Sequence, residues 1–136
     1  REIFGGRPGL SPEHRRRVME CLAMVRLESE ARTAAGDLPL GKQRLGEIAR
    51  ALMSGPGFLM LDEPAAGLRA NEKDELIALL LQLKASGISI LIVEHDMRFV
   101  SKISDQIVVL NFGRKIFDGS PEAMFRDQEV RNAYLG

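Results

Sequence analysis

The sequence lacks the features that mark several broad classes of protein. It holds a single cysteine, Cys21, so a disulfide within the chain is impossible. Its 19 lysine and arginine residues are balanced by 19 aspartate and glutamate residues, which leaves no electrostatic footprint for nucleic acid or an acidic membrane surface. The longest predominantly apolar runs, such as residues 88–93, are far too short to span a membrane. Any partner must therefore be recognised through local sites.

The length of 136 residues allows one modest domain with a core of its own. The chain opens at Arg1 rather than at a methionine. We therefore expect the natural N-terminus to be missing, and the lack of a signal sequence is uninformative. Cys21 falls on the apolar side of a predicted helix, which indicates a buried thiol.

Hydrophobic periodicity and stop signals predict alternating helices and strands. Ser11 and Pro12 form a typical helix start, and Asn71 is a candidate cap for a later helix that Gly87 would end. Residues 28–41 are predicted to be mostly loop. Further helices are predicted over about residues 43–53, over 97–103 and from 120 onward, and strands over 58–61, 88–93, 107–110 and, as the second arm of a hairpin, 115–118.

Residues 58–61 and 88–93 are apolar runs without alternation, which is typical of strands buried on both faces of a parallel sheet. The order strand, helix, strand, helix, strand implies right-handed crossovers and an α/β fold, with helices packed on a parallel sheet. In such sheets, chemistry gathers at the carboxyl ends of the strands. Asp62 and Glu63 follow the first strand and residues 94–96 follow the second, so a site is expected there.

Four apolar residues followed by two acids form the Walker B pattern of phosphate-binding-loop ATPases. Asp62 would hold Mg²⁺ through water while the metal bridges nucleotide phosphates. Glu63 would lie near the terminal phosphate, where it could orient and polarise the attacking water as a general base. A surface turn would also explain the acids followed by Pro64, because acids and proline are common in turns.

His95 comes two residues after the second strand. Its side chain could donate a hydrogen bond to a developing phosphate oxygen, or hold the water and Glu63 in line. A lone histidine at a strand end is more often structural, but the two acids after the neighbouring strand favour a functional role. Gly41 precedes a helix, so its amide could approach a phosphate closely; a simple entry into the helix would explain this glycine as well.

Taken in order along the chain, these segments resemble the ATP-binding-cassette (ABC) ATPases. The matching segments are residues 38–44 (LPLGKQR), similar to the signature loop L-S-G-G-Q; residues 47–52, similar to the helix after it; residues 58–64 (FLMLDEP), similar to Walker B with the catalytic glutamate; residues 66–68, in the place of the D-loop; and His95, in the place of the switch histidine. The resemblance covers residues 11–136. The combination of order and spacing is highly specific, although no single segment is.

A narrower resemblance is to the ATP-binding subunits of branched-chain amino-acid importers. It is carried by residues 62–68 (DEPAAGL), 93–97 (VEHDM), 109–116 (VLNFGRKI) and 133–136 (AYLG), and by Pro39 after the signature leucine. Subunits that serve lipopolysaccharide export share a similar C-terminal ending and remain a rival, as does a non-catalytic, degenerate ABC module. ABC ATPases that act on DNA or ribosomes usually carry long insertions, for which the spacing leaves no room, so no nucleic-acid partner is expected.

The resemblance implies an incomplete three-layer P-loop NTPase fold of the ABC ATPase type. A parallel sheet would be flanked by helices and followed by a C-terminal hairpin and further helices. Residues 1–42 would be a remnant of the helical subdomain with the signature loop, and residues 43–136 the C-terminal part of the catalytic core.

The resemblance also implies how the complete subunit works. Two subunits would sandwich two ATP molecules head to tail, so that the signature loop of one covers the nucleotide held by the other. The implied ligands are ATP and Mg²⁺, with Glu63 and His95 as catalytic residues, Asp62 as the Mg²⁺ residue through water, and Asp62, Leu40, Gly41, Lys42, Gln43 and Gly67 as nucleotide-binding residues. The implied partners are a second ABC ATPase subunit, transmembrane permease subunits and, indirectly, a solute-binding protein, at the cytoplasmic face of the inner membrane.

The sequence departs from the family pattern in several places. It contains no G-x-x-x-x-G-K-[ST] loop, which supplies the backbone cradle and the lysine for the phosphates. We therefore expect the chain to be a fragment that alone binds ATP weakly or not at all, and that exposes an apolar sheet edge favouring self-association. Pro39 replaces the usual serine, Lys42 replaces the usual glutamine and could supply a positive charge, and Arg69 stands where an aspartate is common.

Overall fold

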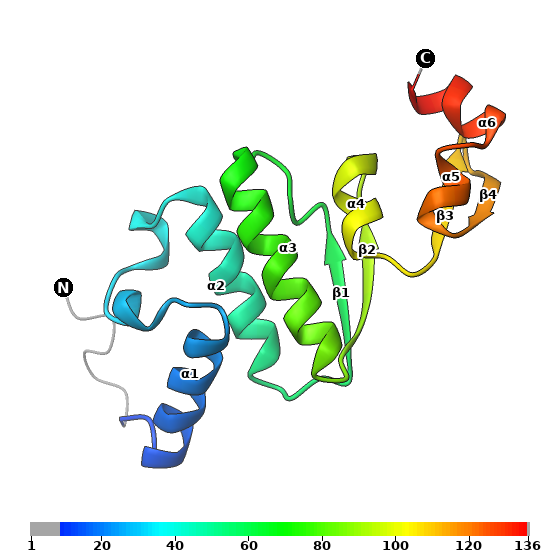
Figure 1. Ribbon diagram of the computed structural model, residues 1–136. Helices are drawn as coiled ribbons and strands as arrows, with labels where there is room; N and C mark the ends of the chain where they lie inside the picture. The colour runs from blue at the N-terminus through cyan, green and yellow to red at the C-terminus, as the bar shows by residue number, and fades with distance from the viewer. Residues whose placement is uncertain (1–8, 136) are drawn as a thin grey trace.

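The protein is described by a computed structural model that covers residues 9–135 (Figure 1). Arg1 and Gly136 lie outside the described residues. The elements in chain order are α1 (Pro12–Met24), two short 3₁₀ turns (Glu28–Glu30 and Ala35–Asp37), α2 (Leu40–Leu52), β1 (Phe58–Asp62), α3 (Ala70–Ala85), β2 (Ser89–Val93), α4 (Met97–Ile103), β3 (Ile107–Asn111), β4 (Arg114–Gly119), α5 (Pro121–Met124), α6 (Gln128–Val130) and a π-helical turn (Arg131–Leu135).

Helix α1 begins as its sequence predicts. The Ser11 hydroxyl accepts a hydrogen bond from the backbone N–H of His14, and Pro12 occupies the first helical turn, where its missing N–H costs nothing. Cys21 is buried as expected. Arg17 ties α1 to the end of α2, because its Nη2 donates to the Leu52 carbonyl oxygen over 2.9 Å.

Two helix starts differ from the sequence prediction. Helix α2 begins at Leu40 rather than near Gln43, because Pro39 serves as its N-cap and the Gln43 N–H already donates to the Pro39 carbonyl. The cap predicted at Asn71 is wrong. The N-cap of α3 is Arg69, two residues earlier, and its N–H donates to the Glu72 carboxylate over 2.8 Å. A carboxylate in the first turn thus satisfies one of the free donors of the helix end.

Strands β1 and β2 pair in parallel, with Phe58 opposite Ser89 and Asp62 opposite Val93. The third strand does not join this sheet: β3 pairs with β4 in a separate antiparallel hairpin. The expectation of one parallel sheet containing all three strands is therefore wrong for the described residues. A hairpin joins strands that are close together in the sequence. The loop that it closes is therefore shorter than a crossover connection and costs less conformational entropy. Figure 1 shows the hairpin set apart from β1 and β2, together with α5 and α6.

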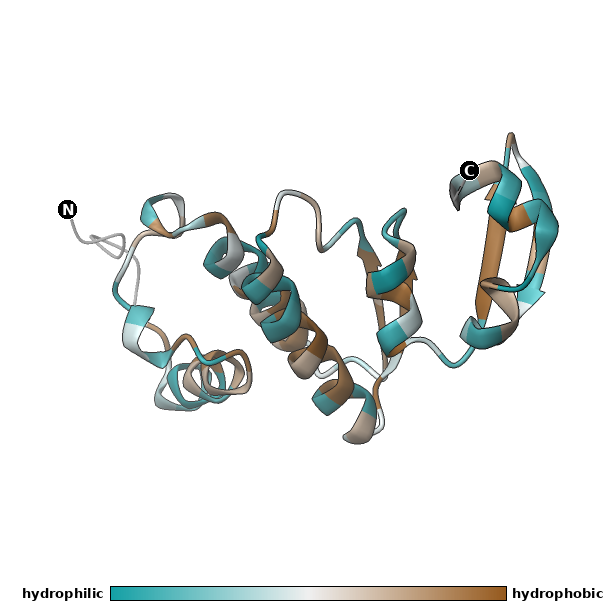
Figure 2. Cartoon of the chain, turned by 45° about the horizontal axis from the view of Figure 1, so that its top comes forward, coloured by the Kyte–Doolittle hydropathy of each residue, from teal (hydrophilic) through white to brown (hydrophobic). Residues whose placement is uncertain are grey.

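Helices cover only one face of the β1–β2 sheet. On the covered face, Leu59 is buried in one hydrophobic cluster with the inner leucines of α3 that the periodicity predicts: Leu76, Leu79, Leu80 and Leu83. On the other face, Phe58, Met60, Leu91 and Val93 are between 47% and 69% exposed. Burial on both faces was therefore predicted wrongly for the described chain. Figure 2 shows the hydrophobic colour concentrated on the strands and on one side of α3.

No helix within residues 9–135 combines the length and the apolarity that crossing a bilayer requires.

The uncovered face predicts that the 136-residue chain associates with itself. Apolar patches of this kind bind one another when nothing else covers them. We expect the sedimentation coefficient of the chain to rise with concentration, and the double substitution Met60→Lys with Leu91→Lys to suppress that rise. Leu81→Lys, at an exposed leucine of α3, is the matched control and should leave the rise unchanged. Equal suppression by all variants would point to a different surface.

A second prediction concerns Asp96, which caps α4. Its Oδ1 accepts from the N–H groups of Arg98 and Phe99, and its Oδ2 lies 2.7 Å from Lys73 Nζ. The hydrogen bond from Lys73, followed by the one from the Phe99 N–H, lowers the pKa of Asp96. The stabilisation is therefore complete above the ordinary aspartate pKa of about 3.9 and is lost as the pH falls through the lower folded-state pKa.

We expect Asp96→Ala to lower the free energy of unfolding by about 1 to 2 kcal/mol at pH 7. Asp96→Asn should cost less, because asparagine can still cap the helix. Urea denaturation followed by circular dichroism at pH 7 and pH 3 measures both variants. The gap between wild type and Asp96→Asn should shrink at pH 3, and a gap that widens there would contradict the ion pair.

Candidate functional site

The predicted site residues gather at one end of the β1–β2 unit. The carboxyl ends of β1 and β2 and the N-terminal ends of α2 and α3 all lie at the upper side of Figure 1. Parallel pairing brings this about, because both strands run the same way and a helix that returns between them starts on the same side. The predicted signature, Walker B and D-loop segments and His95 therefore all lie near this end.

Glu63 sits directly after β1 in an uncommon backbone conformation. Its φ is 43°, in the left-handed region that a non-glycine residue rarely adopts. Its N–H donates to the Val93 carbonyl oxygen over 2.8 Å, which prolongs the pairing of β1 with β2 by one residue. Strain of this kind costs on the order of 1 kcal/mol and persists where the surroundings hold the residue in place. The backbone thus turns the Glu63 side chain away from the strand direction into solvent.

The structure brings His95 and Glu63 together. His95 Nδ1 lies 3.6 Å from Glu63 Oε1 and 3.9 Å from a carboxylate oxygen of Glu94. Both the imidazole and the Glu63 carboxylate are more than half exposed, so a ligand can reach them. The predicted juxtaposition is therefore present, while the catalytic roles of the two residues stay predictions.

Asp62 is the last residue of β1 and is exposed. Within residues 9–135 its carboxylate takes part in no hydrogen bond or ion pair, so it is available to a cation. It borders a cavity of about 230 Å³ that Met60 and side chains of α2 also line. No group of three metal-ligating side chains exists in the described part of the chain. Mg²⁺ keeps several waters and takes only one or two carboxylates besides nucleotide phosphates, so a single free Asp62 fits this ion.

The predicted signature segment packs tightly against the start of α3. Gly41 is buried, and a Cβ added to it would lie 2.6 Å from Glu72 Oε1, so a larger residue there would displace the end of the Glu72 side chain. Gly67 has a φ of +75°, and a Cβ on it would lie 3.0 Å from the Leu40 side chain. The signature segment and the D-loop segment therefore touch within one chain.

The side chains of Lys42 and Gln43 have partners inside the same chain. Lys42 Nζ forms an ion pair with Glu30, and this hydrogen bond lowers the pKa of the Glu30 carboxyl. Gln43 Nε2 donates to the Leu38 carbonyl oxygen over 2.7 Å. Pro39 offers no side-chain acceptor to the helix end, so the first backbone N–H groups of α2 remain the groups at that end best placed for an anion.

Sequence reasoning assigned no role to Glu94, which the structure places at the centre of the site. Its side chain is only 1% exposed. One carboxylate oxygen accepts the Ala65 N–H over 2.8 Å, and the other accepts the His95 N–H over 3.1 Å. The signal in the sequence was an acid between a buried strand and the candidate histidine.

Several curated proteins are similar to this chain over most of its length, although no family model matches it. It is 47% identical over 116 residues to the high-affinity branched-chain amino acid transport ATP-binding protein BraF of Pseudomonas aeruginosa. It is 43% identical over 116 residues to the corresponding protein LivG of Escherichia coli K12. In both cases the alignment covers 85% of this chain and 46% of the relative. The chain thus spans just under half the length of these relatives.

Solved structures show a similarity of the same kind. The ADP conformation of MJ1267, an ATP-binding cassette of an ABC transporter, matches with a TM-score of 0.88 and 29% identity over 98% of this chain and 54% of that one. A nucleotide-free ATP-binding cassette from an ABC transporter matches with a TM-score of 0.84 and 31% identity, over 93% and 51% of the two chains. The predicted fold class is therefore confirmed. Over the residues that it contains, the chain is similar in sequence and in fold to the ATP-binding subunits of ABC transporters.

Proposed function

We propose that this chain forms part of an ABC ATPase subunit that hydrolyses ATP to drive the import of branched-chain amino acids. The observation that carries the proposal is the 3.6 Å approach of His95 to Glu63 at the carboxyl ends of two parallel strands. Its support comes from relatives such as BraF and LivG, whose names give them branched-chain amino-acid transport. Because the chain spans only part of these proteins, the activity belongs to the complete subunit that contains it.

In this proposal Glu63 is the general base. Its exposed carboxylate would accept a proton from the water that attacks the terminal phosphorus of ATP, as the bond to the leaving ADP oxygen breaks. His95 would hold that water or a phosphate oxygen by a hydrogen bond. Asp62 would hold Mg²⁺ through a water molecule. When bound, that ion supplies positive charge beside the phosphate oxygens.

The start of α2 would serve a nucleotide held by a second subunit. The backbone N–H groups of Leu40, Gly41 and Lys42 would face its terminal phosphate, helped by the positive potential of the helix end. Gly67 would allow the D-loop segment to lie close to the signature segment, and Gln43 and Lys42 would act mainly by shaping this end. Residues 1–42 would belong to the helical subdomain and residues 43–136 to the catalytic core.

The proposed partners follow from the same reading. They are a second ATPase subunit, permease subunits within the membrane and, through them, a solute-binding protein, with the subunit at the cytoplasmic face of the inner membrane. A different solute is the second candidate, because the L-arabinose transport protein AraG of Geobacillus stearothermophilus is also 41% identical over 112 residues. Uptake of labelled leucine and of labelled arabinose by cells that carry or lack the complete transporter distinguishes the two.

The proposed role of Glu63 gives a third prediction. In the complete subunit, Glu63→Gln should lower kcat for ATP hydrolysis by roughly 10²- to 10⁴-fold, because the amide cannot accept the proton. Binding of ATP should be retained, since the substitution keeps size and shape. Phosphate release and nucleotide binding by calorimetry measure the two effects. Glu129→Gln, at an exposed position of α6, should change neither, and an active Glu63→Gln enzyme would sink the assignment.

A fourth prediction follows from the lack of a phosphate-binding loop in the 136-residue sequence. The 136-residue chain alone should bind ATP with a Kd weaker than about 1 mM. Such a Kd corresponds to about 4 kcal/mol of binding free energy, and we expect the free N–H donors at one helix end to supply less than this. Isothermal titration calorimetry with MgATP tests this, with the complete subunit as the positive control. Submillimolar binding by the chain alone would mean that the phosphates lie elsewhere.

A further inference from the structure

We propose that Glu94 is a positioning residue that holds the Glu63 turn and the His95 segment in one fixed geometry. The inference deepens the proposed ATPase function and rests on it. Glu94 does not need to touch the nucleotide, because its side chain is 1% exposed while that of His95 is 70% exposed. It acts through the two residues beside it.

The first hydrogen bond of Glu94 holds the turn after β1. Glu94 Oε1 accepts the N–H of Ala65, a buried residue two positions after Glu63. The same turn is anchored a second time, because the Glu63 N–H donates to the carbonyl oxygen of Val93. Two successive residues of the β2 end therefore hold two N–H groups that flank the Glu63 side chain. This double anchor explains how Glu63 stays at a φ of 43°.

The second hydrogen bond of Glu94 holds the backbone of His95. Glu94 Oε2 accepts the His95 N–H, and the same oxygen lies 3.9 Å from His95 Nδ1. On the other side of His95, Asp96 is held by Lys73 from α3. The imidazole is thus exposed, but the backbone that carries it is fixed on both sides.

A buried carboxylate is costly unless hydrogen bonds satisfy it. Glu94 meets this condition with two backbone N–H groups, one from each of the segments that carry Glu63 and His95. Without the side chain, the Ala65 N–H would lose its partner and the turn would be free to shift. A displacement of about 1 Å at a catalytic group can lower a rate by about 100-fold.

The test compares Glu94→Ala and Glu94→Gln in the complete subunit. We expect Glu94→Ala to lower kcat for ATP hydrolysis by about 10- to 100-fold, with the KM for MgATP changed less than about twofold. Glu94→Gln should lose less of its kcat than Glu94→Ala, because its amide oxygen can still accept the Ala65 N–H although its NH₂ group cannot accept the His95 N–H. In the ¹⁵N spectrum, the backbone N–H of Ala65 should become more mobile in Glu94→Ala alone, and that of His95 in both variants.

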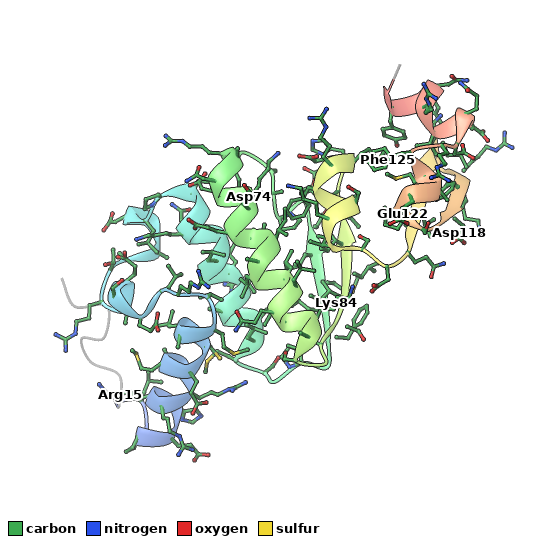
Figure 3. All side chains as sticks on the ribbon, in the orientation of Figure 1. Arg15, Asp74, Lys84, Asp118, Glu122 and Phe125 are labelled. Carbon is green, nitrogen blue, oxygen red and sulfur yellow. The ribbon has the colours of Figure 1, made fainter. Side chains whose placement is uncertain are left out.

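Lys84→Ala is the matched control for a loss of stability alone. Lys84 lies at the far end of α3 (Figure 3), where its Nζ pairs with Asp105 over 2.6 Å. This variant should lose thermal stability and keep its kcat. If Glu94→Ala fails to fold, Glu94→Asp replaces it under the same criteria, because its shorter side chain withdraws the acceptor from Ala65 while remaining polar.

The outcomes separate the two proposals. Loss of activity in Glu63→Gln with full activity in Glu94→Ala would overturn the role of Glu94 and leave the ATPase function standing. Equal loss in Glu94→Ala and Glu94→Gln would also overturn it, because the charge rather than the hydrogen bond would then matter. Full activity in Glu63→Gln would instead refute the proposed function itself.

Discussion

The parallel pairing of β1 with β2 is the constraint on which the rest of the site depends. Its register places Asp62 beside Val93, so the residues that follow each strand emerge next to one another. Glu63 and His95 come from positions 32 residues apart in the chain and meet only because both strands end at the same edge. The helix between them must return to the starting side, which also brings the beginning of α3 to this edge.

Hydrogen bonding then converts proximity into a defined arrangement. The Val93 carbonyl and the Glu94 carboxylate hold the turn after β1, and the Asp96 carboxylate holds the start of α4 and Lys73. Each of these acceptors belongs to a run of four residues at the end of β2. The exposed catalytic candidates are thus carried by backbone that is well anchored beneath them. Local rigidity at an exposed site is what preorganised charge stabilisation requires.

Much of this arrangement was predictable from the sequence, because it depends on local signals. Helix α4 was expected over residues 97–103 and lies at Met97–Ile103, and Ser11 caps α1 as its hydroxyl predicts. The meeting of Glu63 with His95 followed from strand order alone. Each of these predictions needs only short-range periodicity or the known geometry of parallel strands.

The remaining features depend on contacts between distant residues, which a single sequence does not reveal. Glu94 accepts a hydrogen bond from Ala65, which lies 29 positions away in the chain. Lys42 forms an ion pair with Glu30, so its charge already has a partner within the chain. The hairpin of β3 with β4 was predicted and is confirmed, but its separation from the β1–β2 sheet was not predicted, because periodicity does not show which strands pair. The exposed Met60 face was missed for a related reason, since an apolar run shows that a strand can be buried but not what covers it.

The close approach of Gly41 to Glu72 links the signature segment to the first turn of α3. Any side chain at position 41 would displace the Glu72 carboxylate, which also accepts the Arg69 N–H at the beginning of α3. A substitution there would therefore loosen a helix end as well as alter the loop. Evolutionary change at either position is constrained by the other, so the two should vary together rather than independently among related chains.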